Sequence, residues 1–236
     1  MGKSSVEQRA VNAQYNVTAP GSMAQRVAHH VRRKMFTTFM STLRPEAHEE
    51  LLDIGVTSDE SYSGSNYFEE LYPVKAKITA AGIDDARFLE TRYPGVRFVN
   101  ANIIDLPFAD GSYDIVHAAA VWEHVGSRAN QRRALAECLR VARRAVCMTT
   151  PNRWFPIELH TATPVLHWLP HSVYRRIYRA IRLEFFADEA NLNLLRLGEI
   201  KAMARAHPDW RFAYRRARLL GWTSNLILFA ERRSVA

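Results

Sequence analysis

Acidic residues stand near the ends of two apolar runs in the first half of the chain. Asp53 and Gly55 follow the run that begins at Leu51, and Asp84 follows a second run, residues 77–83, about 30 positions later. A carboxylate at the end of a buried strand is costly unless loop N–H groups or a ligand satisfy it, and a glycine lets the backbone approach a ligand closely. A carboxylate at the later position suits the hydroxyls of a ribose. The pattern therefore predicts a nucleotide-type binding site.

The elements that position these residues alternate between strand and helix. Strands are predicted at residues 51–54, 77–83, 96–101, 113–118 and 145–150, then at 211–218 and 225–231, with helices at 29–43, 128–144 and 197–206. Such alternation predicts an α/β fold whose mostly parallel sheet has helices on both faces. Ligands bind such sheets at the carboxyl ends of the strands, and the helix at 29–43 is expected to lie over the bound ligand.

Two motifs in the middle of the chain carry a family resemblance. They are Asp-Leu-Pro-Phe-Ala-Asp-Gly-Ser-Tyr-Asp-Ile-Val at residues 105–116 and Trp-Glu-His-Val at residues 122–125. Over roughly residues 50–155 the chain resembles a class I S-adenosylmethionine-dependent methyltransferase of the type 11 group. The resemblance implies a Rossmann-like, doubly wound, seven-stranded sheet that ends in a hairpin with one antiparallel strand.

The same resemblance implies how the cofactor, S-adenosylmethionine, is bound. Asp53 and Gly55 would shape the methionine end of the site, and Asp84 would hold the ribose hydroxyls. Asn102 and Ile103 would face the adenine. Residues 117–119, beginning with His117, would form the floor of the pocket.

The loop after Asp53 departs from the family pattern. The family has further glycines there, whereas this chain continues from Gly55 with Val-Thr-Ser-Asp at residues 56–59. Either the loop is rebuilt with hydroxyl donors, or the cofactor site is weakened and the protein is a noncatalytic relative. Rebuilding is favoured because the later motifs are intact. A nicotinamide-dependent enzyme is disfavoured because the loop lacks the pattern G-x-G-x-x-G.

The acceptor site is expected in the loops after the fourth and fifth strands. His124 and His160 are candidate general bases by residue type and expected position, although the family's Glu-His pair at 123–124 often organises its loop instead. Asn152, Arg153 and Trp154 offer an amide, a guanidinium and an aromatic ring for a pocket wall, or they simply pack on the sheet.

No metal site is expected from the spacing of the later histidines. His160, His167 and His171 are seven and four positions apart, but Pro164 and Pro170 interrupt any helical face that would join them. Methyl transfer from a sulfonium does not itself require a metal.

The chain is expected to form a flexible leader at residues 1–20 and a single methyltransferase-like domain at 21–236, with an insertion at about 152–195. Within the insertion, residues 172–186 form a basic amphipathic run with Tyr174, Ile177, Tyr178 and Ile181 on one stripe. This helical segment is expected to be a lid over a bulky acceptor, a surface that rests on a membrane, or a helix packed on its own domain.

Charge is distributed unevenly along the chain. The net charge is +8, yet residues 51–130 hold 6 basic and 12 acidic residues, so the remainder sums to +14. The expected partners are a small-molecule, lipid-like or glycan-linked acceptor and, through the insertion, a membrane surface. No nucleic-acid module is visible, so no specific nucleic acid is expected.

Cellular location is inferred from targeting signals and cysteine usage. Neither a signal peptide nor a membrane-spanning segment is visible in the sequence, and Cys138 and Cys147 suggest buried thiols in a reducing compartment. A cytoplasmic location is therefore expected.

Overall fold

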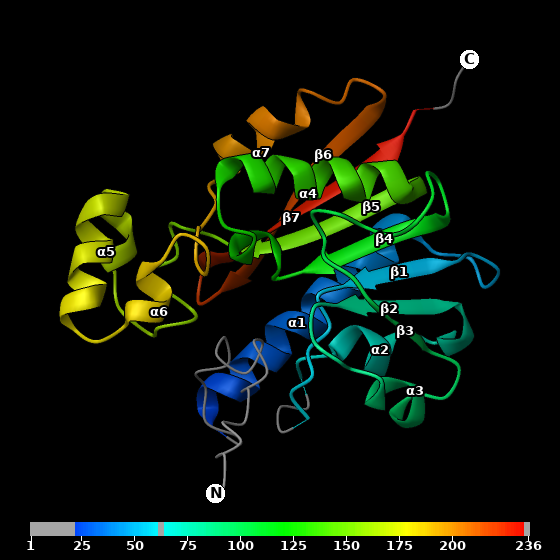
Figure 1. The fold of residues 1–236 in the computed structure, drawn as a ribbon, viewed down its shortest axis with the longest axis horizontal. Helices are drawn as coiled ribbons and strands as arrows, with labels where there is room; N and C mark the ends of the chain where they lie inside the picture. The colour runs from blue at the N-terminus through cyan, green and yellow to red at the C-terminus, as the bar shows by residue number, and fades with distance from the viewer. Residues whose placement is uncertain (1–21, 61–63, 234–236) are drawn as a thin grey trace, which may run out of the picture.

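A seven-stranded sheet organises the computed structural model, which describes residues 22–60 and 64–233 (Figure 1). The sheet order is β3-β2-β1-β4-β5-β7-β6, and every pairing is parallel except those of β7 with β5 and β6. The strands are β1 (Leu51–Ile54), β2 (Ile78–Gly82), β3 (Arg97–Asn100), β4 (Tyr113–Ala119), β5 (Ala142–Pro151), β6 (Trp210–Leu219) and β7 (Trp222–Arg232). The predicted α/β sheet with one antiparallel strand is confirmed. The expected leader, residues 1–20, lies outside the described residues.

Helices cover both faces of the sheet. α4 and α7 pack on one face, whereas α1, α2 and α3 pack on the other. Their bounds are α1 (Met23–Leu43), α2 (Tyr67–Leu71), α3 (Phe88–Arg92), α4 (Arg128–Val141), α5 (His171–Ala180), α6 (Glu184–Ala187) and α7 (Leu197–Ala204), with short 3-10 turns η2 (Lys75–Lys77), η3 (Trp122–His124) and η4 (Leu166–Trp168). Among the described residues, none of the helices combines the length and apolar content that crossing a bilayer requires.

The first helix begins earlier than its apolar pattern predicts. Ser22 caps its amino end by accepting a hydrogen bond from the backbone N–H of Gln25 at 3.2 Å. Val31, Met35 and Phe39 are buried at intervals of four residues, which is the spacing of one helix face. This stripe packs against the sheet and continues into the wall of the cavity described below.

The helix α4 links the sheet to the turn that follows β4. Ser127 caps the helix by accepting from the N–H of Asn130 at 3.2 Å, and the Trp122 indole donates to the carbonyl of Gln131 at 2.7 Å. Cys138 in α4 and Cys147 in β5 are both buried free thiols, as predicted. These contacts hold η3, with its Glu-His pair, in a fixed position against α4.

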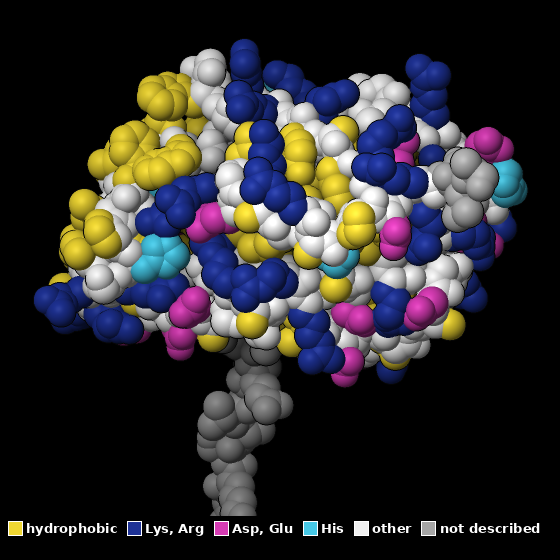
Figure 2. All heavy atoms as spheres, turned by 90° about the horizontal axis from the view of Figure 1, so that it is seen from above, with side chains coloured by type: hydrophobic (Ala, Val, Ile, Leu, Met, Phe, Trp, Pro, Cys, Tyr) yellow, Lys and Arg dark blue, Asp and Glu magenta, His cyan; other side chains and the backbone are white. Residues whose placement is uncertain are grey.

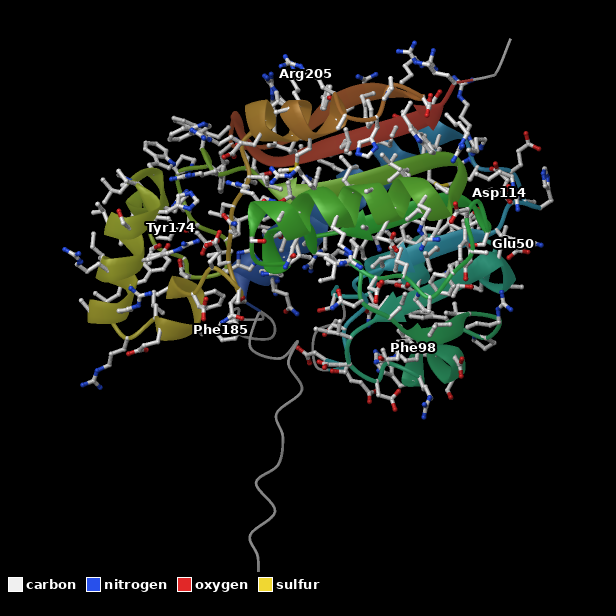
Figure 3. The ribbon with its side chains drawn as sticks, turned by 45° about the horizontal axis from the view of Figure 1, so that its top comes forward. Glu50, Phe98, Asp114, Tyr174, Phe185 and Arg205 are labelled. Atoms are coloured by element: carbon white, nitrogen blue, oxygen red, sulfur yellow. The ribbon has the colours of Figure 1, made fainter. Side chains whose placement is uncertain are left out.

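The amino ends of the strands form a separate network at the opposite end of the molecule. The Asp114 carboxylate accepts from the backbone N–H of Glu50 at 2.9 Å and pairs with Arg143. Figure 3 shows Glu50 and Asp114 together at this end, far from Tyr174 and Phe185. Asp114 therefore supports the start of β4 and takes no part in a site at the carboxyl ends of the strands.

The insertion between β5 and α7 has a small core of its own. Tyr174, Tyr178 and Phe186 are buried in it, and the Tyr178 hydroxyl lies 2.7 Å from the hydroxyl of Thr163. The expected run 172–186 is not one helix, because Arg182 has a positive φ of 62° that separates α5 from α6. Ile181, expected on the same apolar stripe as Tyr174 and Tyr178, lies beyond the end of α5 and is 48% exposed.

Candidate functional site

A cavity of about 820 Å³ lies where β1, β2, β4 and β5 end. α1 contributes Val31 and Met35 to its wall, and the insertion contributes Phe155 and His160. The parallel strands bring their carboxyl ends to one edge of the sheet, so loops that are distant in sequence share this space. The position agrees with the edge predicted from the sequence.

The glycine at the end of β1 has no room for a side chain. Gly55 has a φ of +101°, and a Cβ built on it would lie 1.9 Å from the Cγ2 of Val121. Its N–H donates to the carbonyl of Ala81 at 2.8 Å. Both Gly55 and Val121 line the cavity, so the glycine allows the ends of β1 and β4 to approach each other at the site.

The loop after Gly55 is closed by an amide that sequence reasoning missed. The Asn66 side chain accepts from the N–H of Thr57 at 2.9 Å and donates to the carbonyl of Thr57 at 3.0 Å. The Thr57 hydroxyl accepts from the N–H of Asp59 at 3.1 Å. The loop that lacks the family's further glycines is thus ordered by Asn66, and only its distance in sequence from Asp53 concealed that role.

The residues expected at the adenine lie together on one part of the cavity wall. Asn102 and Ile103 both line the cavity, and the Asn102 side chain accepts from the N–H of Ile104 at 3.2 Å. Asp84 is half-buried two residues beyond β2 and is not on the wall, whereas its neighbour Ile83 is. The Ser58 hydroxyl lies 3.5 Å from the Asp84 carboxylate.

Asp53 and His117 do not line the cavity. They are paired across β1 and β4, and side chains alternate along a strand, so both project to the face covered by α1 and α2. There the Asp53 carboxylate accepts a hydrogen bond from His117, whose ring stacks on Phe68 with centroids 4.3 Å apart. Of the residues 117–119 expected at the pocket floor, Ala119 lines the cavity and His117 does not.

Burial governs the charges of this inner pair. It raises the pKa of Asp53 to about 7 and lowers the pKa of His117 to about 3. Burial also raises the pKa of Glu69 in α2, and the nearby charge of Asp53 adds to that effect. Asp53 and His117 thus form a buried polar contact beneath the site, with both groups favouring their neutral forms.

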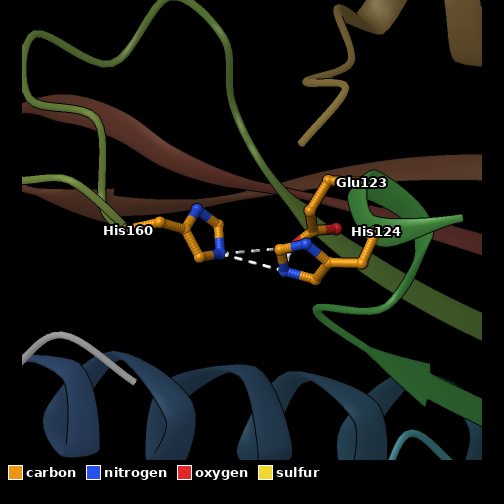
Figure 4. A group of neighbouring side chains, drawn as sticks. All are labelled: Glu123, His124 and His160. Atoms are coloured by element: carbon orange, nitrogen blue, oxygen red, sulfur yellow. Dashed lines mark hydrogen bonds and ion pairs between the residues drawn. The ribbon is translucent and has the colours of Figure 1, made fainter. Parts of the chain in front are cut away.

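The two candidate bases meet at the other end of the cavity. The Nε2 atoms of His124 and His160 lie 3.1 Å apart, and both residues line the cavity (Figure 4). The Nδ1 of His160 donates to the Oε1 of Glu158 at 2.7 Å. Glu123 is fully buried beside them and accepts from the Thr150 hydroxyl at 2.8 Å. Sequence reasoning named both histidines but assigned no partner to either.

These four groups shift one another's pKa values. Burial lowers the pKa of His124 to about 3 and raises that of Glu123 to about 7. Burial opposes the charged form of His160, but the Glu158 carboxylate outweighs it and raises the pKa of this histidine. The pKa of Glu158 falls to about 2, because the His160 charge and several hydrogen bonds outweigh burial.

The three expected substrate residues lie away from the cavity wall. Asn152 donates through its side chain to the carbonyl of Thr223 at 2.9 Å, and Trp154 is 47% exposed. Arg153 is buried, and its guanidinium donates to the carbonyls of His167 and Leu169 at 3.1 and 2.9 Å. The strand β5 ends just before this tripeptide, so the chain turns through it and approaches the cavity only from Phe155 onward.

The later histidines do not converge. His167 binds the carbonyl of Phe155 at 2.8 Å, and His171 contacts the guanidinium of Arg153. Each is used to hold the insertion together. His160, His167 and His171 therefore make separate contacts.

Two hydroxyls of residues on the cavity wall have no hydrogen-bond partner within the described residues. They are Ser65 Oγ and Thr149 Oγ1, and both atoms are buried. Buried polar atoms are ordinarily paired.

Comparison with known proteins bears on the same region. Residues 60–146 match a family model described as methyltransferase domain. Two probable S-adenosylmethionine-dependent methyltransferases of Mycobacterium tuberculosis, from strains CDC 1551 and H37Rv, are each 33% identical over 99 residues. That stretch is 40% of this chain and 35% of each relative, so the match spans about a third of the relatives' length.

Solved structures share the fold over nearly the whole chain. A possible histamine N-methyltransferase from Thermotoga maritima has a TM-score of 0.57 at 15% identity, covering 89% of this chain and 92% of that one. Magnesium protoporphyrin IX methyltransferase from Synechocystis PCC 6803, solved with bound SAH, has a TM-score of 0.57 at 12% identity, covering 94% and 92%. The chain thus shares the fold and sheet order of these solved methyltransferases, and residues 60–146 match the methyltransferase domain model.

Proposed function

We propose that the protein transfers the methyl group of S-adenosylmethionine to an acceptor bound in the same cavity. The observation that carries this proposal is the continuity of one cavity from Gly55 and Ile103 to the pair His124 and His160. A volume near 820 Å³ lies in the range of small-molecule sites. The names of the mycobacterial relatives support the same cofactor.

The cofactor end of the cavity fits a nucleoside with a polar tail. Asn102 and Ile103 provide an amide and an apolar surface for adenine, and the backbone at Gly55 admits a close ligand. The unpaired hydroxyls of Ser65 and Thr149 would bind polar atoms of the cofactor or acceptor. Asp84, next to the wall residue Ile83, remains our proposed partner for the ribose hydroxyls. Asp53 does not line the cavity, and its proposed role is to fix the end of β1 through its hydrogen bond with His117.

The acceptor end is mostly apolar around the histidine pair. Phe155, Ile157 and Leu159 line it, beside His124 and His160. A sulfonium is already an activated methyl donor, so the protein need mainly align the acceptor and exclude water. The acceptor that suits this wall is a small or lipid-like molecule with an apolar body, whose nucleophilic atom lies at the imidazoles.

We also propose that the insertion touches a membrane surface when the acceptor is lipid-like. On α5, Val173 is exposed beside Arg176 and Arg179. Figure 2 shows apolar and basic side chains side by side on the end of the molecule that carries the insertion. An apolar patch edged with arginines suits the interface of an anionic bilayer.

The first test measures cofactor binding by calorimetry. Wild-type protein should bind S-adenosylmethionine and S-adenosylhomocysteine with one site, and should not bind NADH. Gly55→Ala should weaken both dissociation constants at least about tenfold, because the new methyl group displaces Val121 on the cavity wall.

The matched control is Gly221→Ala. Gly221 also has a positive φ, +84°, but a Cβ there meets nothing within 4 Å. It should therefore carry the backbone strain without the steric effect at the cavity. Equal binding by Gly55→Ala and wild type, or no binding by folded wild type, would contradict the proposal and favour a noncatalytic relative.

A further inference from the structure

Three donor atoms from two distant loops converge at the acceptor end of the cavity. The Nε2 atoms of His124 and His160 are 3.1 Å apart, and Glu123 Oε1 lies 3.8 and 4.0 Å from them. All of these atoms lie within 4.8 Å of one another. Ligand bonds of about 2.0–2.2 Å place donors that share one ion about 3 to 4 Å apart. These distances are therefore close to those of a metal site, and the three side chains would need little rearrangement to bind one ion.

The outer atom of each donor group is fixed by a second contact. His124 Nδ1 bonds the carbonyl of Asn191 at 2.7 Å, and His160 Nδ1 bonds Glu158 at 2.7 Å. The other oxygen of Glu123, Oε2, accepts from the Thr150 hydroxyl. Metal-binding histidines ordinarily donate their second N–H to a carbonyl or carboxylate in this way. The inner atoms are thereby aimed at one point.

The hydrogen bonds also determine which ring nitrogens carry protons. A carbonyl only accepts, so the His124 Nδ1 must be protonated to bond Asn191. Glu158 already accepts from the backbone N–H groups of His160 and Thr161, so it acts as an acceptor toward His160 Nδ1 as well. Two neutral rings would then face each other with lone pairs at 3.1 Å. That contact is stable only with a positive species, a proton or a metal ion, between the nitrogens.

The Glu123 oxygen separates these two alternatives. Glu123 Oε1 is completely buried and has no hydrogen-bond partner in the described part of the chain. A buried carboxylate oxygen left without a partner is costly. A proton shared by the two imidazoles would leave it unbonded, whereas a metal ion between the three groups would bind it.

We propose that Glu123, His124 and His160 bind one divalent transition-metal ion at the acceptor end of the cavity. Two imidazoles and one carboxylate suit zinc, iron(II) or cobalt(II), and are a poor set for magnesium or calcium. Three protein ligands leave coordination positions open, and both histidines face the cavity. The prediction of no metal concerned a site built on His160, His167 and His171, and it did not include Glu123 or His124.

The role of the ion, unlike its binding, rests on the proposed methyl transfer. A hydroxyl acceptor coordinated to the ion would lose its proton to solvent more readily. The resulting oxygen would attack the methyl carbon, forming the C–O bond as the C–S bond breaks and its electron pair stays on sulfur. S-adenosylhomocysteine and the methyl ether are the products, so the step needs neither oxidant nor reductant.

The test uses the full chain stripped with a chelator and then titrated with Zn²⁺, Co²⁺ and Mg²⁺ by calorimetry. We expect one equivalent of Zn²⁺ or Co²⁺, visible absorption bands for bound Co²⁺, and no binding of Mg²⁺. Glu123→Gln and His160→Ala should each weaken Co²⁺ binding at least about tenfold and alter its spectrum.

The control is His48→Ala, which removes a histidine whose side chain is largely exposed. It should bind Co²⁺ like wild type. Circular dichroism of each variant establishes that it is folded, and Glu123→Gln keeps the shape of the side chain if His160→Ala does not fold. Absence of Co²⁺ and Zn²⁺ binding by wild type, or binding that neither Glu123→Gln nor a folded His160→Ala changes, would overturn the metal site.

A parallel titration of the stripped protein with S-adenosylhomocysteine separates this inference from the proposed function. Cofactor binding without metal binding would leave the methyltransferase proposal standing and the metal site wrong. Metal binding without cofactor binding would support the metal site and contradict the methyltransferase proposal.

Discussion

At the scale of residues, strand geometry decides which predicted groups reach the cavity. Asp53 ends an apolar run, which the sequence shows, but its side chain projects beneath α1 and α2 because strand side chains alternate. The period of two also places His117 on that face. Gly55, Asn102 and Ile103, which follow strand ends, do line the cavity. Their location was predictable because loops after parallel strands share one edge.

The buried pair Asp53 and His117 gives a pH-dependent prediction. Burial raises the pKa of Asp53 from 3.8 to about 7, so the folded state binds more protons than the unfolded state in that window, and this group lowers the free energy of unfolding as pH rises. The depressed pKa of His117 has the opposite effect, because it makes the free energy of unfolding rise with pH between about pH 3 and 6.5. Asp53→Asn removes the first effect and keeps His117.

The measurement is urea unfolding of wild type and Asp53→Asn at several values between about pH 4.5 and 7.5. The mutant should gain stability relative to wild type as pH rises, by on the order of 2–4 kcal/mol across the window. Asp53 also contributes to the raised pKa values of Tyr67, Glu69 and Cys147. Its replacement therefore lowers the pKa of Glu69, which adds to the gain of the mutant in the same direction. A stability difference that stays constant with pH would refute this assignment.

At the scale of elements, one guanidinium joins the segment after β5 to the helical part of the insertion. Arg153 bonds two carbonyls around η4 and contacts His171 at the start of α5. A guanidinium after a strand looks the same in sequence whether it binds substrate or backbone. The strands, α4 and α7 were predicted within a few residues, since their apolar patterns depend on local burial. The break between α5 and α6 was not, because it depends on the insertion's own core.

Arg153→Met should therefore loosen the insertion without affecting the cofactor. Losing hydrogen bonds from a charged group costs about 1.5–3 kcal/mol, which corresponds to roughly tenfold to hundredfold faster local opening. Hydrogen exchange of peptides from residues 166–181 measures this directly, and the affinity for S-adenosylhomocysteine should stay within about twofold.

Arg176→Met is the matched control, because Arg176 lies on the exposed face of α5. It should exchange like wild type. Unchanged exchange in Arg153→Met would contradict this role of the guanidinium.

At the scale of the whole molecule, acidic and basic residues are concentrated in different parts of the chain. The acidic excess falls at residues 51–130, which supply most of the cofactor end, and residues 171–218 hold 11 basic against 5 acidic residues. Arg205 at the end of α7 stands on the basic outer side (Figure 3). The sequence predicted this distribution fully, since charge needs no tertiary contact. A cytoplasmic location remains a prediction.

Membrane contact through α5 is tested with vesicles. Wild type should co-sediment with vesicles rich in phosphatidylglycerol and not with neutral phosphatidylcholine vesicles, and high salt should release it. Reversing Arg176 and Arg179 to Glu should lower the bound fraction about tenfold or more. Arg216→Glu on β6 is the control for net charge, and an equal loss in this variant would argue against contact through α5.

The order of the strands also has a consequence for biosynthesis. β7, made after the other strands, lies between β5 and β6, so the sheet has a gap until residues 222–232 leave the ribosome. Until then the edge of β5 carries unpaired backbone groups from Ala145 to Pro151, an open template for pairing with a neighbouring chain. A nascent chain released before this strand is complete should consequently aggregate or be degraded, even though most of the residues that line the cavity have already been made.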